Sequence, residues 1–555
     1  MLKDGQLYIA HSENGNINLI GKMANRHGLI AGATGTGKTV TLQVLAETFS
    51  QAGVPCFMAD MKGDLSGISQ PGRLSGFIEK RMPEFGIENP QFAGCPTRFF
   101  DVFGEQGFPM RATVSAMGPQ LLARLMELTE DQAGVLNAVF RIADDNNLLL
   151  IDLKDLKLML DFVGKNAAKF TTEYGNIAPA SIGAIQRSVL QIESEGGDKF
   201  FGEPAFEVED LFAVENGRGV MNVLAADKLM LNPKLYSTYL LWLITELYAK
   251  LPEVGDLELP KFVFFFDEAH MLFDGTSKAL VNKIEQVIRL IRSKGVGIYF
   301  ITQVPSDVPV NVLAQLSNRV QHALRAYTPQ DQKAVRAAAE TFRTNPAFKT
   351  EDAILDLGTG EALVSFLDEK GAPSVVERAK ILFPLSQIGA ITPGQRLDIQ
   401  AAAPDRLKDY EKFFDRESAY EVLTEANEKA EKQKEKEAKA AEKEKEKKAK
   451  EKEKKSSSKS KKGGIGRTIF GTMIAAAATS FARSAGTSIA KSIGSSKSKK
   501  STSSSKKTTT TKKSGTSTKS SSGSILGDTV KKATKTAANT ATRKVTTEIL
   551  KSIFS

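Results

Sequence analysis

The chain is poor in the residues that build covalent and metal-bound frameworks. Its 555 residues include two cysteines, Cys56 and Cys95, one tryptophan and four histidines. Two cysteines exclude a disulfide scaffold and a four-cysteine metal site, and Cys56 lies in an apolar run where a buried thiol is expected. No long apolar segment stands at the N-terminus, which argues against a secretory signal peptide. These absences together favour a protein of the reducing cytoplasm.

An acidic body is followed by a basic tail. Residues 1–424 contain 42 Lys and Arg against 53 Asp and Glu, whereas residues 425–555 contain 33 against 12. Such a tail suits a polyanionic partner, either nucleic acid or an anionic membrane surface, although charge can also serve only to keep a tail soluble. The length corresponds to roughly two to four domains, and 41% hydrophobic residues suffice for a large core.

Up to about residue 412 the sequence has the pattern of an α/β fold with a parallel-rich sheet. Short apolar runs bounded by glycine and proline alternate with longer segments of helical periodicity. We expect strands at 28–31, 55–59, 219–224, 262–266, 297–301 and 361–367. Residues 1–72 and 217–412 then form two parts of one domain. Residues 73–216, mainly of helical periodicity, are interpreted as a helical insertion that serves as a lid or an oligomer contact.

The tail divides into four segments. Residues 413–462 are rich in alternating Glu and Lys and predict a charged helix held by i,i+4 ion pairs, without the apolar stripe of a coiled coil. Residues 463–495 predict an amphipathic helix, whose uncharged span of 15 residues is shorter than the ~20 needed to cross a bilayer. Residues 496–524 form a Ser/Thr/Lys linker expected to be disordered. Residues 525–555 predict a second amphipathic helix, and the two apolar stripes could contact each other, another subunit or a membrane surface.

The strongest motif is a phosphate-binding loop. Residues 32–39 read GATGTGKT, match the pattern GxxxxGK[ST], and stand between an apolar strand and an amphipathic helix as that pattern requires. The loop consists of Gly32, Ala33, Thr34, Gly35, Thr36, Gly37, Lys38 and Thr39. Its glycines let backbone N–H groups surround phosphates. We expect Lys38 to reach the β- and γ-phosphates of ATP and the Thr39 hydroxyl to hold Mg²⁺.

Carboxylates are predicted at the same edge of the sheet. The apolar run 262–266 ends in Asp267 and Glu268, and the carboxyl ends of parallel strands meet at one edge. We expect Asp267 to bind Mg²⁺ and Glu268 to polarise the attacking water, a function that hydrolysis requires. Gln303 follows another apolar run and would lie beside these acids if the two strands are neighbours. There it would sense the γ-phosphate or orient water, or serve only as a structural amide, and His270 has a similar alternative as a helix cap.

These motifs resemble a known group of motors. The segments RHGLIAGATGTGKT and FFFDEAH, the helix with Arg289 and Arg292, and YFITQVPSDVP resemble, in that order, the HerA/FtsK branch of RecA-like motor ATPases. With SNRVQHALRAYTPQD and the two tail helices, the chain is most similar to the bacterial HerA-helicase-like proteins of the YjgR type. The resemblance covers about residues 15–400. It implies a RecA-like P-loop fold and a ring, usually a hexamer, with ATP bound between subunits.

The resemblance also implies functions for two arginines. In the HerA pattern the arginine at the place of Arg26 reaches the γ-phosphate of the neighbouring subunit as an arginine finger, and Arg292 matches a second catalytic arginine. From the residues alone, a surface charge is the simpler interpretation of each. HerA also carries an N-terminal β-barrel domain that docks a nuclease. Here the loop begins at residue 32, so we do not expect coupling to an end-resection nuclease.

We therefore expect a cytoplasmic, Mg²⁺-dependent ATPase that forms a ring and acts as a DNA translocase or helicase. Hydrolysis is indicated by the motifs, whereas DNA is implied by the resemblance and by the basic tail. The alternative is an ATP-driven motor for protein assembly or secretion, or an ATP-switched scaffold anchored by its tail helices. Stimulation of hydrolysis by DNA would distinguish these alternatives.

Overall fold

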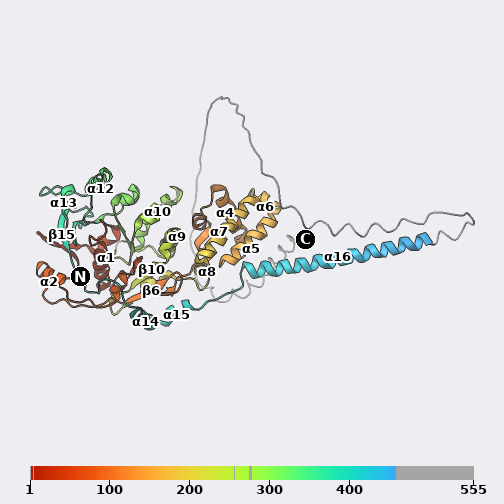
Figure 1. Cartoon of the computed structure of the whole chain (residues 1–555), viewed down its shortest axis with the longest axis horizontal. Coiled ribbons are helices and arrows are strands. Elements are labelled where there is room, and N and C mark those ends of the chain that lie inside the picture. Colours follow the sequence, from red (N-terminus) through yellow and green to blue (C-terminus); the bar gives the residue numbers. More distant parts are fainter. Residues whose placement is uncertain (1, 4, 256, 274–277, 458–555) are drawn as a thin grey trace, which may run out of the picture. The chain divides into compact units, whose positions relative to one another are not determined.

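The computed structural model describes residues 2–3, 5–255, 257–273 and 278–457 (Figure 1). Residues 1–428 form one unit by their contacts, and from Lys429 on a second unit begins. In the described residues thirteen strands form one mixed sheet, with β3 (Gly15–Leu19) beside β2. In sheet order the other strands are β1 (Leu2–Lys3), β2 (Gln6–Ser12), β15 (Glu377–Ile381), β14 (Glu361–Ser365), β13 (Asn318–Gln321), β4 (Gly28–Ala31), β12 (Val296–Thr302), β11 (Phe262–Phe266), β5 (Cys56–Asp60), β10 (Met221–Ala225), β6 (Thr97–Asp101) and β7 (Phe108–Pro109).

The strands from β13 to β7 run parallel, and the strands from β14 to β1 continue the sheet antiparallel. All residues of β4, β5, β10, β11 and β12 are buried, as expected of parallel strands covered on both faces. One strand, β12, separates β4 from β11. The carboxyl ends of these three strands therefore stand side by side at one edge of the sheet.

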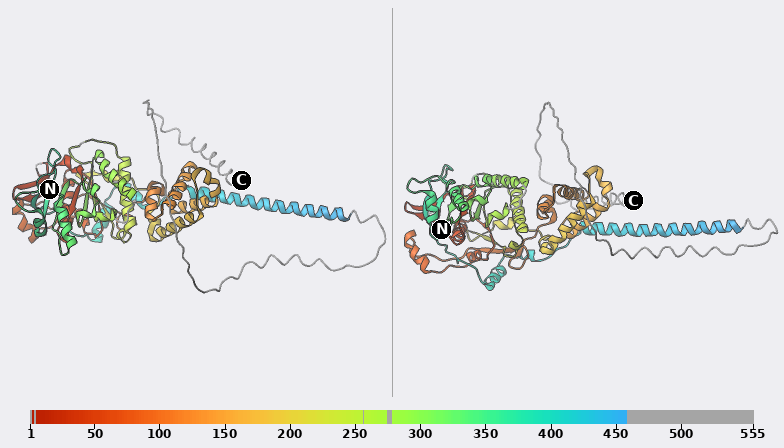
Figure 2. Two further views of the ribbon diagram at one scale, coloured as in Figure 1. Left: turned by 90° about the horizontal axis from the view of Figure 1, so that it is seen from above. Right: turned by 45° about the horizontal axis from the view of Figure 1, so that its top comes forward.

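Alternate residues of the central strands pack on different helices. On one face, Phe265 and Tyr299 lie against Phe49 of α1 (Lys38–Gln51), with ring centroids 6.4 and 5.9 Å from that of Phe49. The other face is covered by α9 (Pro233–Lys250) and α10 (Lys278–Ile291), which contact each other (Figure 2). This alternation follows from the two-residue period of a strand. It fixes the direction in which each strand end presents its polar residues.

A group of helices lies apart from the sheet, as Figures 1 and 2 show. We call α3–α8, residues 114–200, the helical insertion. Its members are α3 (Val114–Leu125), α4 (Glu130–Asp145), α5 (Leu153–Lys165), α6 (Ala167–Tyr174), α7 (Pro179–Ile192) and α8 (Asp198–Phe200). The wider interval 73–216 also contains β6 and β7, which belong to the large sheet. The boundaries of 1–72, 73–216 and 217–412 remain a prediction.

The remaining elements connect these layers. They are α2 (Gly76–Arg81), β8 (Val214–Glu215), β9 (Arg218–Gly219), α11 (Val310–Leu313), α12 (Pro329–Ala339), α13 (Thr350–Asp356), α14 (Pro393–Ala401) and α15 (Asp405–Lys408). None of the helices in the described part of the chain combines the length and hydrophobicity that a bilayer crossing requires.

The expected charged helix is present as α16 (Ala419–Ser457). Its first turn is attached to the helical insertion, because the buried carboxylate of Asp155 accepts hydrogen bonds from Ser418 Oγ at 2.5 Å and from the backbone N–H of Tyr420 at 2.9 Å. Farther along, Lys439 and Lys448 form i,i+4 ion pairs with the glutamates at 435 and 444. The predictions for 463–495, 496–524 and 525–555 lie outside the described residues.

Candidate active site

The predicted phosphate loop joins β4 to α1 and depends on glycine at particular positions. Gly32, Gly35 and Gly37 have φ angles of +155°, +77° and +115°, values that L side chains rarely adopt. A Cβ atom on Gly32 would lie 2.5 Å from Cβ of His322, so the loop packs directly on that histidine. Thr34 and Gly35 form the exposed part of the loop, whereas Thr36 is buried.

Lys38 begins α1 and turns back over the loop. Its Nζ atom donates hydrogen bonds to the carbonyl oxygens of Gly32 at 2.6 Å and Ala33 at 3.1 Å. Burial lowers the pKa of Lys38, and the carboxylates of Glu268 and Asp267 act in the opposite direction. The ammonium group therefore stands between the loop and the acidic end of β11.

Asp267 and Glu268 follow β11 directly and have different surroundings. Burial, followed by the charge of Glu268, raises the pKa of Asp267 to about 6. Glu268 has a φ of +48°, an uncommon left-handed conformation for a residue with a side chain. Its Oε1 lies 3.7 Å from Nζ of Lys62, and its Oε2 lies 3.5 Å from Nδ1 of His270. Within the described residues, Oε2 is buried without a hydrogen-bond partner.

Gln303 lies where the loop and the acids meet. It follows β12, and its carbonyl oxygen accepts a hydrogen bond from the N–H of Gly32 at 3.1 Å. Gln303 also lines a cavity of about 480 Å³ together with Lys62, Glu268 and His270. The structure thus brings Gln303 to the same edge as the phosphate loop and the acids.

The two arginines lie at the opposite edge. Arg26 ends the 3-10 helix Gly21–Arg26, one residue before β4, and Arg292 begins the 3-10 helix Arg292–Lys294, which ends one residue before β12. The four residues of β4, at about 3.3 Å each, separate Arg26 from the loop by roughly 13 Å. The charge of Arg292 acts on His27, the residue after Arg26. The structure therefore places both arginines at the amino edge of the sheet and not beside their own phosphate loop.

Four further residues at these edges were given no function in the sequence analysis. His27 and His322 are buried, Lys62 faces Glu268, and Arg124 lines the cavity described above. His322 Nε2 accepts from the Thr41 hydroxyl at 2.8 Å, while its Nδ1 donates to the carbonyl of Glu361 at 2.9 Å. His322 thereby joins α1, the helix after the phosphate loop, to β14. The one available signal was that Lys62 follows a predicted strand by a few residues.

His27 fixes the backbone behind Arg26. Its Nδ1 accepts a hydrogen bond from the N–H of Ile298 at 3.0 Å, so the proton resides on Nε2, which donates to the carbonyl of Ile288 at 2.8 Å. Burial, assisted by the charge of Arg292, lowers the pKa of His27 to about 4. The neutral imidazole therefore links the end of α10 to β12 next to both arginines.

This histidine makes a testable contribution to stability. Folding favours the neutral form of His27, whose pKa is about 4 in the folded chain and about 6.5 when unfolded. The stabilisation is complete above pH ~6.5 and is lost as the pH falls toward 4. We compare the free energy of unfolding of the wild type with that of His27→Gln. The difference between the two should decrease by about 2–3 kcal/mol when the pH is lowered from 7 to 4.5.

Urea unfolding followed by fluorescence of the buried Trp242 measures this difference. The shifted pKa values of Asp60, Asp267 and His322 affect both proteins alike and cancel in the comparison. A difference that is the same at both pH values would show that His27 does not titrate between the folded and unfolded states.

The site and the sheet order together define a P-loop ATPase of RecA-like fold, as expected from the sequence. The chain matches the family model described as helicase HerA-like C-terminal over residues 6–500, and it belongs to that family. The expected relationship to HerA-type motors is therefore confirmed.

Among individual proteins, the DNA double-strand break repair helicase HerA of Sulfolobus acidocaldarius is 29% identical over 99 residues. The match spans 18% of this chain and 19% of that relative. Of the solved structures, the bacterial conjugative coupling protein TrwBdeltaN70 is 15% identical, with 71% of this chain and 92% of that chain covered and a TM-score of 0.45. VirB4 of Thermoanaerobacter pseudethanolicus is also 15% identical, with 68% and 97% covered and a TM-score of 0.45.

Proposed function

We propose that the protein is a Mg²⁺-dependent, ring-forming ATPase that translocates or unwinds DNA. The observation that carries the ring-forming ATPase is the division of the site between two edges of one sheet. Lys38, Glu268 and Gln303 gather at the carboxyl edge, while Arg26 and Arg292 stand at the amino edge. A neighbouring copy that presents its amino edge to this carboxyl edge completes the site.

The residues fit ATP and Mg²⁺. A side chain at Gly32 would clash with His322, so the backbone of the loop is exposed at that point, and Lys38 already binds two carbonyl groups over the loop. In the described residues there is no cluster of three or more His, Cys, Asp or Glu for a metal ion. Mg²⁺ in phosphate sites needs no such cluster, because it keeps waters and phosphate oxygens as ligands. Thr39 and Asp267 supply the hydroxyl and carboxylate oxygens that it prefers.

Each residue then has a distinct function. Lys38 and the loop amides bind the phosphates, and bound Mg²⁺ neutralises charge on them. Glu268 orients and polarises the attacking water, and Gln303 senses the γ-phosphate from the adjacent strand. Arg26 and Arg292 of a neighbouring subunit stabilise the charge that develops on the transferred phosphoryl group. We infer a homo-oligomer, with a hexameric ring as its form.

DNA is proposed as the substrate on two grounds. The family is described as helicase HerA-like, and residues 425–555 carry a large excess of Lys and Arg. A cytoplasmic location suits both, and a nuclease partner of the HerA type is not part of the proposal. A motor for protein assembly or secretion, or an ATP-switched scaffold with its tail on a membrane surface, remains the alternative, because the basic tail also suits anionic lipid.

We expect double-stranded DNA to stimulate ATP hydrolysis by the full chain several-fold, and a chain ending at Ala426 to keep the basal rate with weaker DNA binding. That truncation retains Ser418 and Tyr420, which hold Asp155. Binding by phosphate contacts should fall with salt, by about 0.9 in the log–log slope per neutralised phosphate. Phosphate release at several salt concentrations and fluorescence anisotropy of labelled DNA measure both effects.

The matched control is Lys38→Ala, which should bind DNA without hydrolysis. Stimulation by vesicles of anionic lipid but not by DNA would contradict the DNA proposal and favour the scaffold alternative. DNA binding that is unchanged by the truncation would assign the tail to another partner.

A further inference from the structure

The segment that carries Glu268 is held from outside the sheet at two points. After β11 the chain passes through Asp267 and Glu268 into the 3-10 helix Ala269–Leu272. Tyr236 of α9 donates a hydrogen bond from its hydroxyl to the carbonyl of Asp267 at 3.1 Å. At the other end of the segment, Arg124 Nη2 donates to the carbonyl of Leu272 at 3.3 Å.

Arg124 belongs to the helical insertion and not to the ATPase sheet. It lies in the last turn of α3, which packs on α9. The same Nη2 atom donates to Ser237 Oγ at 2.9 Å, so one guanidinium group joins α3, α9 and the 3-10 helix after Glu268. Tyr236 and Ser237 are consecutive on α9. The insertion and α9 therefore position the acidic segment together.

The position of Arg124 is unusual for a charged side chain. Burial lowers its pKa to about 10. In the described part of the chain its Nη1 atom is buried without a hydrogen-bond partner. Partial burial of a charged group costs free energy that hydrogen bonds must offset. Nη2 donates the two hydrogen bonds described above, to Ser237 and to Leu272. These bonds indicate that Arg124 serves to hold α9 and the 3-10 helix after Glu268.

The backbone conformation of Glu268 and the cavity beside it make its position dependent on neighbouring elements. Its backbone has φ of +48°, a conformation that persists only when the surroundings impose it. Its side chain and that of Arg124 line the same cavity of about 480 Å³. A displacement of α3 that breaks the hydrogen bond from Arg124 to Leu272 would thus act on the short 3-10 helix that directly follows Glu268.

We propose that Arg124 is a positioning residue for Glu268, through which the helical insertion controls the rate of ATP hydrolysis. The inference rests on the catalytic function proposed for Glu268, but not on DNA as the substrate. A displacement of the insertion changes the orientation of the carboxylate and leaves the phosphate loop in place. The insertion is then a control element of the hydrolysis step.

A double-mutant cycle tests this. Arg124→Gln is expected to lower kcat by about 10- to 100-fold, because small misplacements of catalytic groups cost rates of this order, with KM for ATP changed less than about twofold. In a Glu268→Gln background the same substitution should lower the remaining rate less than about twofold, since the side chain through which it acts is already altered. Arg124→Lys, which keeps one charged donor, should have an intermediate kcat.

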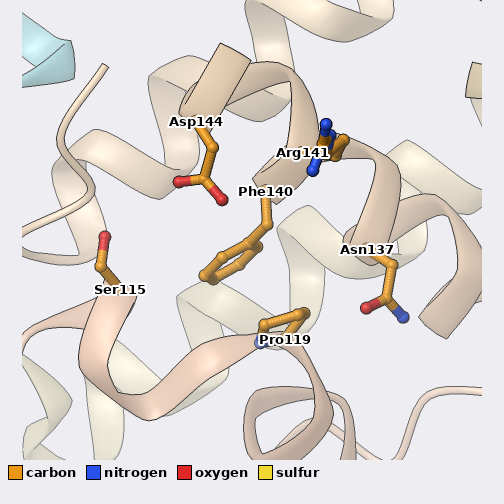
Figure 3. A pocket seen from close by; sticks show the side chains of 6 residues that line it. All are labelled: Ser115, Pro119, Asn137, Phe140, Arg141 and Asp144. Carbon is orange, nitrogen blue, oxygen red and sulfur yellow. The ribbon is translucent and has the colours of Figure 1, made fainter. Parts of the chain in front are cut away.

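Arg141→Gln is the matched control in the same insertion. Arg141 lines a second cavity, of about 420 Å³, between α3 and α4, with Ser115, Phe140 and Asp144 around it (Figure 3). It is 70% exposed and pairs with Asp145 at 3.0 Å, so its loss should leave kcat unchanged. If Arg124→Gln does not fold, as judged by circular dichroism and nucleotide affinity, Arg124→Lys takes its place in the cycle.

The outcomes separate the two proposals. A loss of kcat by Arg124→Gln that is equally large in the Glu268→Gln background overturns the link between these residues. A rise in KM as large as the fall in kcat also overturns it, because the substitution then acts on nucleotide binding. A wild-type rate for Glu268→Gln by itself refutes instead the function proposed for Glu268.

Discussion

The Lys38→Ala protein is expected to lose nucleotide binding and with it all measurable ATP hydrolysis, whereas Glu268→Gln is expected to bind ATP normally and to hydrolyse it at least about 100-fold more slowly. Lys38 supplies contacts to phosphate that exist in the ground state as well as in the transition state. Glu268 is proposed to act on the attacking water and not on the phosphates, so its loss should affect the chemical step more than nucleotide binding. The two substitutions therefore separate binding from chemistry.

Equilibrium binding of a fluorescent ATP analogue and steady-state phosphate release measure the two quantities. A useful control is Lys62→Ala, whose ammonium lies 3.7 Å from Glu268 but outside the phosphate loop, so that ATP affinity should persist. Equal turnover by Glu268→Gln and wild type would remove Glu268 from the mechanism. Normal nucleotide affinity in Lys38→Ala would contradict the assignment of the loop.

Arg26→Ala is expected to lower hydrolysis by about 10³-fold or more, and mixing it with Lys38→Ala is expected to restore part of the activity. Removal of an arginine finger has effects of this size. Arg26 stands at the amino edge of β4 and its own loop at the carboxyl edge, so the two belong to different sites if copies meet edge to edge. In a mixed ring some interfaces join an intact loop to an intact arginine.

Activity is measured at a fixed total concentration for each variant alone and for mixtures in several ratios, after time for subunit exchange. A maximum at intermediate ratios is the expected result. The double variant mixed with wild type should show no such maximum, and its activity should fall faster than by dilution, because each double-variant subunit contributes neither an intact loop nor an intact arginine. Full activity of Arg26→Ala alone would contradict the shared site and reduce the residue to a surface charge. The same design applies to Arg292.

Much of the fold followed from the sequence because its central strands are uniformly apolar. All six expected strands are present, with ends shifted by at most two residues. Apart from β14, the antiparallel side of the sheet was not anticipated, since β3 and β15 mix exposed and buried residues in short segments without a clear period. Strand β6 was missed because it stands in an interval dominated by helical patterns, from which it returns to pair with β10.

The site was predictable where residues follow strands and unpredictable where packing decides. Lys38, Asp267 and Gln303 stand at the ends of elements that the sequence shows, so their edge of the sheet could be foreseen. Arg124 lies far from them in the chain, and only the docking of α3 on α9 brings it to Leu272. His322 was hidden in the same way, because it follows β13, a strand that was not expected.

The strand order also dictates when the site can form as the chain is synthesised. The phosphate loop is complete at residue 39, yet β4 pairs with β12 and β13, whose last residues are Thr302 and Gln321. At the far edge, Ala10 of β2 pairs with Ile381 of β15, so this pairing requires about 380 residues to be synthesised first. The chain must close these long loops before the strand contacts can form. Folds that depend on such distant contacts fold slowly, and this sheet is expected to do so. A nascent chain shorter than about 320 residues carries the nucleotide motif without the neighbours that shape it.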